Sequence, residues 1–391
     1  MKNMNRFKRN IGLEYLFCFV RAFNISSAIW VLYMVYKGLS LWEIGIVEGV
    51  YHLASFLFEV PTGAFADLLG RKTVMILGRI CSAISCIILL YAGNILGFLF
   101  GFVLSAFSDN LNSGSEEALV YDSMKEIGTE EGYIKVNGRL NVLIEVSQGM
   151  ATFVGGLLAE YSYFVCYMMS AVIAIGSLIP LSFMKEPPIG SKEKKKEKVT
   201  VKTHFKTSFH VIKEKPKVIK ILIYYPVVAA FYTVLFFYGQ QYFAEYGFDK
   251  VGISLIMLGA SAVSCIGSLC SEWALARFGE KTKYIASVIM AIGIILVSRN
   301  QVVISMIGFA AASFVNSLLY PIESSSLNQL IPSEQRATII SVDSMCFSFA
   351  MICIFPLSGV IATVLSLRIA FLVLGIVEIA MVALLIRRKH S

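Results

Sequence analysis

Residues 63–72 read Gly63-Ala-Phe-Ala-Asp67-Leu-Leu-Gly70-Arg71-Lys72, a charged turn set between two long apolar runs. The run before the turn covers residues 41–67, and the run after it covers residues 72–92. Each run is as long as the roughly 20 residues that a helix needs to cross a bilayer. The segment therefore predicts two membrane helices joined by a short basic loop.

The composition extends this prediction to the whole chain. Of the 391 residues, 57% are hydrophobic and 15% are charged, against roughly 45–50% and 25% in soluble domains. These values exclude a soluble enzyme, a coiled coil and a disordered chain, and the continuous apolar runs exclude a membrane barrel. Dividing the runs at loop signals predicts twelve spans, at residues 11–37, 41–67, 72–92, 95–123, 134–160, 162–184, 218–246, 250–277, 282–298, 301–330, 334–363 and 367–387.

Basic residues set the orientation of these spans. Residues 185–217 hold eleven lysines against four glutamates and few aromatic residues, so they predict a cytoplasmic linker near anionic headgroups and no nucleic-acid partner. With the N-terminus inside, the cytoplasmic segments hold 27 of the 34 lysines and arginines, which predicts a plasma-membrane protein with both termini cytoplasmic. The predicted domains are a six-helix bundle at 1–184, the linker at 185–217 and a second six-helix bundle at 218–391.

The two halves carry traces of a repeat. The turn at 67–72 aligns with Ala276-Arg-Phe-Gly279-Glu280-Lys281 at an offset of 209, and residues 115–119 align with residues 323–327 at an offset of 208. Two places that agree within a residue indicate a duplicated six-helix unit, an arrangement that places a substrate site near the bilayer midplane between the halves.

The turn at 63–72 resembles the loop 2–3 signature of the major facilitator superfamily, G-x-x-x-D-x-x-G-R-[KR]. With six spans on either side of a basic linker, the resemblance covers essentially the whole chain. It implies an all-α membrane protein with twelve transmembrane helices in two pseudo-symmetric six-helix bundles, and a secondary transporter that works by rocking of its halves. By the same resemblance Asp67 is a conformational latch with Arg71 and Lys72 as its counter-charges, and Gly63 and Gly70 permit close helix approach. Arg79 follows Arg71 by two turns in span 3 and is expected to complete the latch. The alternative is that Arg71 and Lys72 only mark the cytoplasmic side.

Other patterns of the family are reduced in this chain. The span 4 arginine of proton-coupled drug exporters is replaced by Asn110, four residues before Gly114, and only Gly155-Gly156 remains of the span 5 exporter signature. The overall sequence, including residues 327–338, is still similar to bacterial drug and tetracycline exporters. The resemblance therefore favours proton-coupled export of a lipophilic or amphipathic molecule.

Charged residues inside the spans are candidates for proton coupling. A charge costs roughly 2.5–3.5 kcal/mol at the centre of a membrane helix, so such residues usually face the protein interior or a wet cavity. Arg21 in span 1 needs an acid, for which Glu59, Glu116 and Glu145 are candidates. The acids and the histidine of spans 2 and 4 lie on single helical faces and include Glu48, His52, Glu59, Asp109 and Glu116. The alternatives are that Glu48 lies near the outer surface and that Glu59, or the Arg21 pair, is only structural.

A second set of residues predicts a substrate cavity. Span 7 is rich in aromatic and amide side chains, which suit an amphipathic organic substrate but also commonly face lipid. The predicted cavity residues are Asn24, Asn112, Tyr225, Tyr232, Phe236, Gln240, Asn316, Tyr320 and Glu323.

No pattern predicts an enzyme, a metal site or a cofactor. The chain shows no catalytic Ser/His/Asp set or metal cluster, and its eight cysteines lie in apolar runs as packing residues. The predicted partners are a small-molecule substrate, protons as coupling ion and membrane lipid, with a monomer as the oligomeric state. Two alternatives remain: proton-driven uptake or facilitated diffusion of a small polar metabolite, and a non-transporting membrane sensor.

Overall fold

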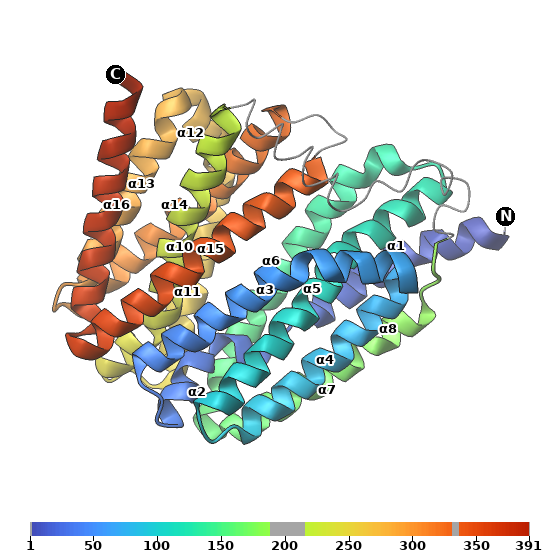
Figure 1. Ribbon diagram of the computed structural model, residues 1–391, viewed down its shortest axis with the longest axis horizontal. Helices are drawn as coiled ribbons and strands as arrows, with labels where there is room; N and C mark the ends of the chain where they lie inside the picture. Colours follow the sequence, from blue (N-terminus) through green and yellow to red (C-terminus); the bar gives the residue numbers. More distant parts are fainter. Residues whose placement is uncertain (1, 188–215, 331–335, 391) are drawn as a thin grey trace. The chain divides into compact units, whose positions relative to one another are not determined.

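The computed structural model describes residues 2–187, 216–330 and 336–390 and is helical throughout these ranges (Figure 1). Contacts divide the chain into two compact units, the first comprising Met1–Tyr33 and Val50–Val199 and the second Met34–Gly49 and Thr200–Ser391. The predicted linker at 185–217 falls mostly outside the described residues, and the predicted domain limits remain a prediction.

The helices of the N-terminal half follow one another with short connections. They are α1 (Lys2–Ala22), the 3-10 turn η1 (Ile25–Ala28), α2 (Trp30–Tyr36), α3 (Leu41–Leu69), α4 (Arg71–Tyr91), α5 (Ile95–Glu126), η2 (Glu130–Gly132), α6 (Tyr133–Tyr161), α7 (Tyr163–Gly176) and α8 (Leu178–Phe183). The helices of the C-terminal half are α10 (Pro216–Glu245), α11 (Lys250–Leu269), α12 (Ser271–Phe278), η3 (Gly279–Lys281), α13 (Thr282–Val297), α14 (Val302–Leu330), α15 (Arg336–Val364) and α16 (Leu367–His390).

Ten helices in the described ranges are long and apolar enough to cross a membrane. The predicted first span at 11–37 is not one continuous helix, because the chain breaks after Ala22 into η1 and α2. At the break the Ser26 amide donates to the Ser170 hydroxyl at 3.0 Å, and the Ser26 hydroxyl donates to Asn24 Oδ1 at 2.8 Å. Side chains thus replace helical backbone bonds, as a membrane setting requires.

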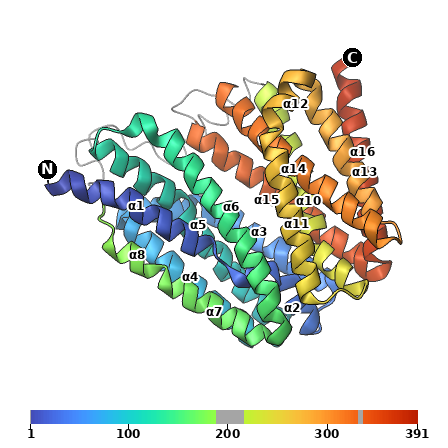
Figure 2. The same cartoon turned by 180° about the vertical axis from the view of Figure 1, so that it is seen from behind.

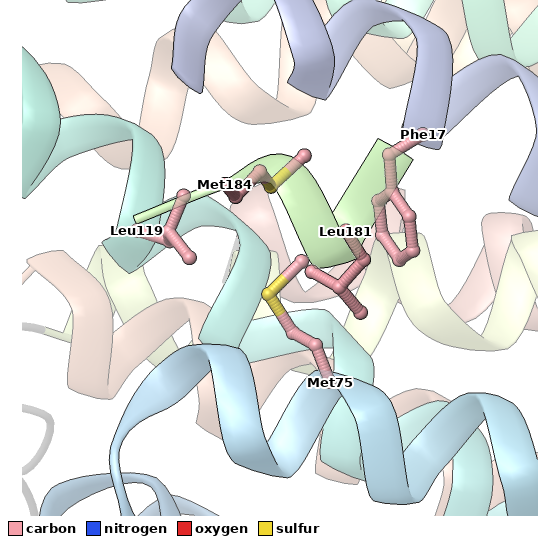
Figure 3. Packing of buried hydrophobic residues seen from close by; sticks show 5 residues of the cluster. All are labelled: Phe17, Met75, Leu119, Leu181 and Met184. Atoms are coloured by element: carbon pink, nitrogen blue, oxygen red, sulfur yellow. The ribbon is translucent and has the colours of Figure 1, made fainter. Parts of the chain in front are cut away.

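The first unit is held together by α1, α4, α5 and α7, which pack against one another, and α6 lies beside α1 (Figure 2). One of its buried clusters joins four helices and the segment after α8. Figure 3 shows this cluster of Phe17, Met75, Leu119, Leu181 and Met184. Because lipid is as apolar as the core, close packing rather than hydrophobic burial holds such helices together.

Small residues allow the helices of the second unit to approach closely. A methyl group at Gly293 would lie 2.7 Å from the Gly308 carbonyl oxygen, so α13 and α14 touch through backbone. Residues 34–49 group with this unit because α3 begins against α10 and α15. The Tyr238 hydroxyl donates to the Leu41 carbonyl at 2.8 Å, and the Trp42 amide donates to the Thr363 hydroxyl at 2.9 Å.

Candidate functional site

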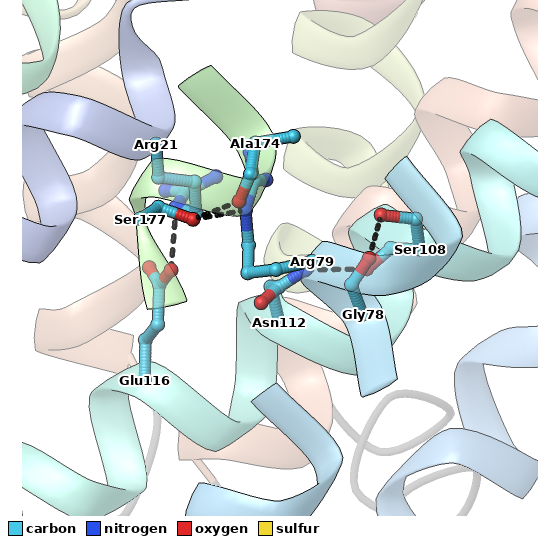
Figure 4. A network of polar contacts seen from close by, with 8 residues as sticks. All are labelled: Arg21, Gly78, Arg79, Ser108, Asn112, Glu116, Ala174 and Ser177. Atoms are coloured by element: carbon cyan, nitrogen blue, oxygen red, sulfur yellow. Dashed lines mark hydrogen bonds and ion pairs between the residues drawn. The ribbon is translucent and has the colours of Figure 1, made fainter. Parts of the chain in front are cut away.

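The core of the first unit contains a network of buried charges (Figure 4). Arg21, at the end of α1, pairs with Glu116 of α5, with 2.5 Å between Arg21 Nε and Glu116 Oε1. Of the three acids proposed for Arg21, Glu116 is therefore the one that the structure places against it. Glu145 is exposed on α6, with no ion pair or hydrogen bond to any residue that the structure describes.

Glu14 joins this network and was not singled out from the sequence. Its side chain is 1% exposed, it lies on α1 two turns before Arg21, and it interacts electrostatically with Arg21 and Glu116. The spacing of Glu14, Cys18 and Arg21 puts them on one helical face, which is the signal that could have identified Glu14. A buried acid beside an existing ion pair gives the network two carboxylates around one guanidinium.

Arg79 belongs to the same core rather than to the loop after α3. It is buried, and its Nε donates to the Ser177 hydroxyl at 2.8 Å, which in turn donates to the Ala174 carbonyl at 2.6 Å (Figure 4). The guanidinium therefore ties α4 to the junction of α7 and α8. Among the described residues, Arg79 forms no hydrogen bond or ion pair with the charged turn, although the two lie on one helix.

The predicted stripe on α3 faces more than one environment. Tyr51 donates to Asp109 Oδ2 at 2.8 Å, and Ser55 donates to Asn110 Oδ1 at 2.9 Å, so α3 and α5 are joined by two polar contacts. Asp109 stays exposed on its helix. On α3 itself, Glu48 and His52 are buried and Glu59 is half-buried.

The charged turn after α3 binds a residue that the sequence did not suggest. Gly70 has φ +90°, and the Arg71 and Lys72 amides each donate to a Glu186 carboxylate oxygen at 2.8 Å. Glu186 therefore caps the N-terminus of α4, where the helix dipole favours an anion. A methyl group at Gly70 would lie 3.2 Å from the Glu186 carboxyl carbon, so the glycine serves the backbone conformation and this approach.

The basic side chains of the turn also have partners. Arg71 Nη1 lies 2.8 Å from Asp122 Oδ2, and Lys72 Nζ donates to the carbonyls of Ser182 and Met184 at 2.9 and 2.7 Å. The side chain of Asp67, the predicted latch acid, lies outside the described part of the structure. The proposed close helix approach at Gly63 is not seen, because a methyl group there would meet nothing within 4 Å.

A carboxyl pair lies in the second unit. Glu323 of α14 and Asp343 of α15 interact electrostatically, and Glu323 Oε1 and Asp343 Oδ1 are buried without a hydrogen-bond partner in the described ranges. Two neighbouring buried carboxylates repel each other when both are ionised. The sequence placed Glu323 in a substrate cavity and did not pair it with Asp343.

Most predicted cavity residues of α10 are packed instead of open. Tyr225 and Gln240 are buried, Tyr232 donates to the Ser313 hydroxyl at 3.3 Å, and Phe236 stacks on Phe309. Helix α10 runs through the middle of its unit and is buried over 61% of its span, so its aromatic side chains fill the core. The Gln240 amide has no hydrogen-bond partner among the described residues.

The remaining predicted cavity residues are spread over both units. Asn112 is buried, packs against Gly78 and donates to the Ser108 carbonyl at 2.8 Å, which makes it a packing residue of α4 and α5. Asn24 is exposed beside the break after α1, Asn316 is half-buried and Tyr320 is 69% exposed. The described residues contain no group of three or more His, Cys, Asp or Glu that could hold a metal ion.

Comparison with known proteins gives a consistent set of likenesses. The sequence profile described as the Major Facilitator Superfamily matches residues 13–298 and, in a second match, residues 228–391. A curated relative is YxaM of Bacillus subtilis (strain 168), an uncharacterized MFS-type transporter. It is 23% identical over 376 residues, which cover 94% of this chain and 92% of YxaM.

Solved structures resemble the chain over nearly its full length. The nucleoside transporter NupG has a TM-score of 0.79 at 14% sequence identity, with 99% of this chain and 100% of NupG covered. The D-xylose-proton symporter has a TM-score of 0.74 at 11% identity, with 97% and 96% covered. At these sequence identities the likeness to the solved structures shows the fold alone.

Proposed function

Because the chain belongs to the major facilitator superfamily, we propose that it couples proton movement to the transport of a small organic molecule. Membership of this superfamily and the likeness of the chain to the solved structures confirm the predicted fold. The chain is a multi-pass membrane transport protein rather than an enzyme. The coupling ion, the substrate and the direction of transport are parts of the proposal.

We assign the proton coupling of the second unit to the neighbouring carboxyl groups of Glu323 and Asp343. In the proposed state the pair holds one proton, which relieves the repulsion between the two buried carboxylates. Loss of that proton leaves two negative charges side by side in a membrane helix bundle, which drives the groups apart or draws in a cation. A group that binds and releases a proton together with a change in helix contact is what a proton-coupled transporter needs.

The first unit supplies a second part of the proposal. We assign proton coupling there to Arg21, Glu59, Asp109 and Glu116, with Glu14 added from the structure. Protonation of Glu116 would cancel its attraction for Arg21, whose charge must then find another acid in a medium where an unpaired arginine is costly. Glu14 is the acid nearest in the chain that shares this interior.

Export of an amphipathic compound by alternating access remains our first candidate for substrate and direction. It is supported by the sequence resemblance to drug and tetracycline exporters. The relatives compared above are not described as exporters of this kind, so they add nothing to this support. It is also supported by the exposed carboxylates Asp109 and Glu145, which within spanning helices face an aqueous path in preference to lipid. The protein is proposed to act as a monomer in the plasma membrane with both termini cytoplasmic.

Proton-driven uptake of a small polar metabolite is the second candidate. The observation in its favour is the packing of Tyr225, Tyr232 and Phe236 inside the second unit, which removes aromatic surface from any substrate cavity.

Infrared difference spectroscopy tests the proton-binding pair without knowledge of the substrate. A pH titration of purified protein in nanodiscs follows the C=O stretching band of protonated carboxyl groups. We expect Asp343→Asn and Glu323→Gln each to remove one titrating component of this band. The matched control is Glu272→Gln, an exposed acid on α12, which leaves the component in place. A component that survives both pair variants would contradict the proposal.

Proteoliposomes with an internal pH dye then test coupling. Lipophilic cations, tetracycline-like compounds, nucleosides and simple sugars are added to the wild type, Asp343→Asn and Glu272→Gln. Substrate-dependent proton movement is expected in the wild type and in Glu272→Gln, with at least a tenfold loss in Asp343→Asn, on the order of 1.4 kcal/mol or more. Equal proton movement in all three proteins would contradict the assignment to the pair.

A further inference from the structure

A groove of about 560 Å³ runs along the first unit between α1 and α6, which lie side by side (Figure 2). It is lined by Tyr15 of α1 and, on the first three turns of α6, by Lys135, Gly138, Arg139, Val142 and Leu143. The groove takes no part in the proposed proton coupling, because none of its residues contacts the buried charges described above.

The charged end of the groove is unsatisfied. Lys135 and Arg139 are one turn apart, both are exposed, and neither forms an ion pair or hydrogen bond with a residue in the described ranges. Like charges at this spacing on a helix repel each other, so an anion between them is stabilising. Tyr15 adds a hydroxyl with no hydrogen-bond partner among the described residues, on a ring that packs against Cys18, Val120, Met124 and Leu140.

An apolar stripe continues from the charged end along α6. Val142, Val146 and Met150 follow Arg139 on nearly the same helical face, and their side chains are 62%, 49% and 48% exposed. Only 28% of the α6 span is buried, compared with 50% for α4. Glu145 lies about 120° around the helix from Arg139 at 100° per residue, so the stripe itself carries no acid.

We propose that this groove binds an anionic phospholipid, with its phosphate between Lys135 and Arg139 and an acyl chain along Val142, Val146 and Met150. Two cations followed by an apolar stripe match such a lipid, in which an anionic headgroup is followed by an apolar acyl chain. Basic pockets between membrane helices on the cytoplasmic side are recognised sites for anionic headgroups. The proposal rests on the orientation in which α6 begins at the cytoplasmic side, and it is independent of what the protein transports.

Photo-labelling in nanodiscs locates the acyl chain. The probe is phosphatidylglycerol with a photoactivatable diazirine on one acyl chain, added to intact purified protein, and the labelled peptides are identified by mass spectrometry. We expect labelling of residues 142–150 that falls at least fivefold in the double variant Lys135→Gln/Arg139→Gln. Labelling confined to other segments, or unchanged in this variant, would overturn the proposal.

Native mass spectrometry supplies the matched control and separates lipid from free anion. Lys217→Gln/Lys220→Gln removes the same charge from two exposed lysines one turn apart on α10. The wild type and this control are expected to retain one more phosphatidylglycerol than the groove variant, with no such difference for phosphatidylcholine. An excess of inorganic phosphate that displaces the retained lipid, or equal retention in all three proteins, would overturn the lipid site. Melting temperatures within about 2 °C of the wild type show that the variants remain folded.

Discussion

Arg21 and Glu116 show how a single residue constrains a membrane bundle. A guanidinium inside the first unit requires an acid at contact distance, and Glu116 meets it from another helix at 2.5 Å. The pair is shielded, with side-chain exposures of 23% and 11%, so its loss is not repaired by water. Glu14, with 1% exposure, is the only acid of α1 and shares the same interior.

We expect Glu116→Gln to destabilise the protein by about 3–5 kcal/mol, because it leaves a buried arginine without its carboxylate. The measurement is the thermal unfolding midpoint of purified protein in detergent. Glu117→Gln is the control, since the neighbouring glutamate is exposed. Equal midpoints for the two variants would mean that Arg21 is satisfied by other groups, such as Glu14. The double variant Arg21→Met/Glu116→Gln is expected to recover part of the loss.

At the scale of the element, the turn between α3 and α4 is organised by a residue more than a hundred positions away. The Glu186 carboxylate accepts hydrogen bonds from the first two amides of α4. The Lys72 side chain donates hydrogen bonds to the carbonyls at the end of α8. The sequence signature locates the turn correctly, but it cannot show which acid meets it, because the partner depends on where the end of the sixth span packs.

The two glycines of the turn are expected to behave differently. Gly70→Ala places a side chain at φ +90° and against the Glu186 carboxyl, which costs about 1–3 kcal/mol. Gly63→Ala adds a methyl group in open space within α3 and gains about 0.5–1 kcal/mol of helix propensity. Thermal unfolding of the two variants in parallel checks the difference. A destabilised Gly63→Ala and an unaffected Gly70→Ala would reverse the interpretation.

At the scale of the whole molecule, the fold could be predicted because its signals are long and repeated. Apolar runs of bilayer length, a basic linker and the turn at 63–72 all survive errors of a few residues. The candidate sites could not be predicted to the same degree. Helical spacing places Asp109, Asn112 and Glu116 in one stripe, yet the first is exposed, the second packs on Gly78 and the third pairs with Arg21. The break after Ala22 was also missed, because Ser170 that stabilises it is distant in sequence.

The predicted orientation has a direct test on the whole molecule. A green fluorescent protein fused after Ser391 is expected to fluoresce, and alkaline phosphatase at the same position is expected to be inactive, because each reporter works on one side of the plasma membrane only. Fusions after Lys37, in the first loop, are the control and are expected to give the opposite pair of signals. Active phosphatase at the C-terminus would contradict the placement of both termini in the cytoplasm.

The cap on α4 also determines how mechanical load enters the first unit. Tension on the chain beyond residue 187 passes through Pro187 to Glu186, which is fastened to the first turn of α4 by two hydrogen bonds. Lys185 is fastened in turn to Asn10 of α1, through its amide at 2.9 Å and its carbonyl at 2.7 Å. A pull from the linker is therefore shared between two helices that are far apart in sequence. Residues 185–186 are therefore bonded to α1 and α4 together. A displacement of these two residues acts on the helix that carries Arg21 and on the helix that carries Arg79.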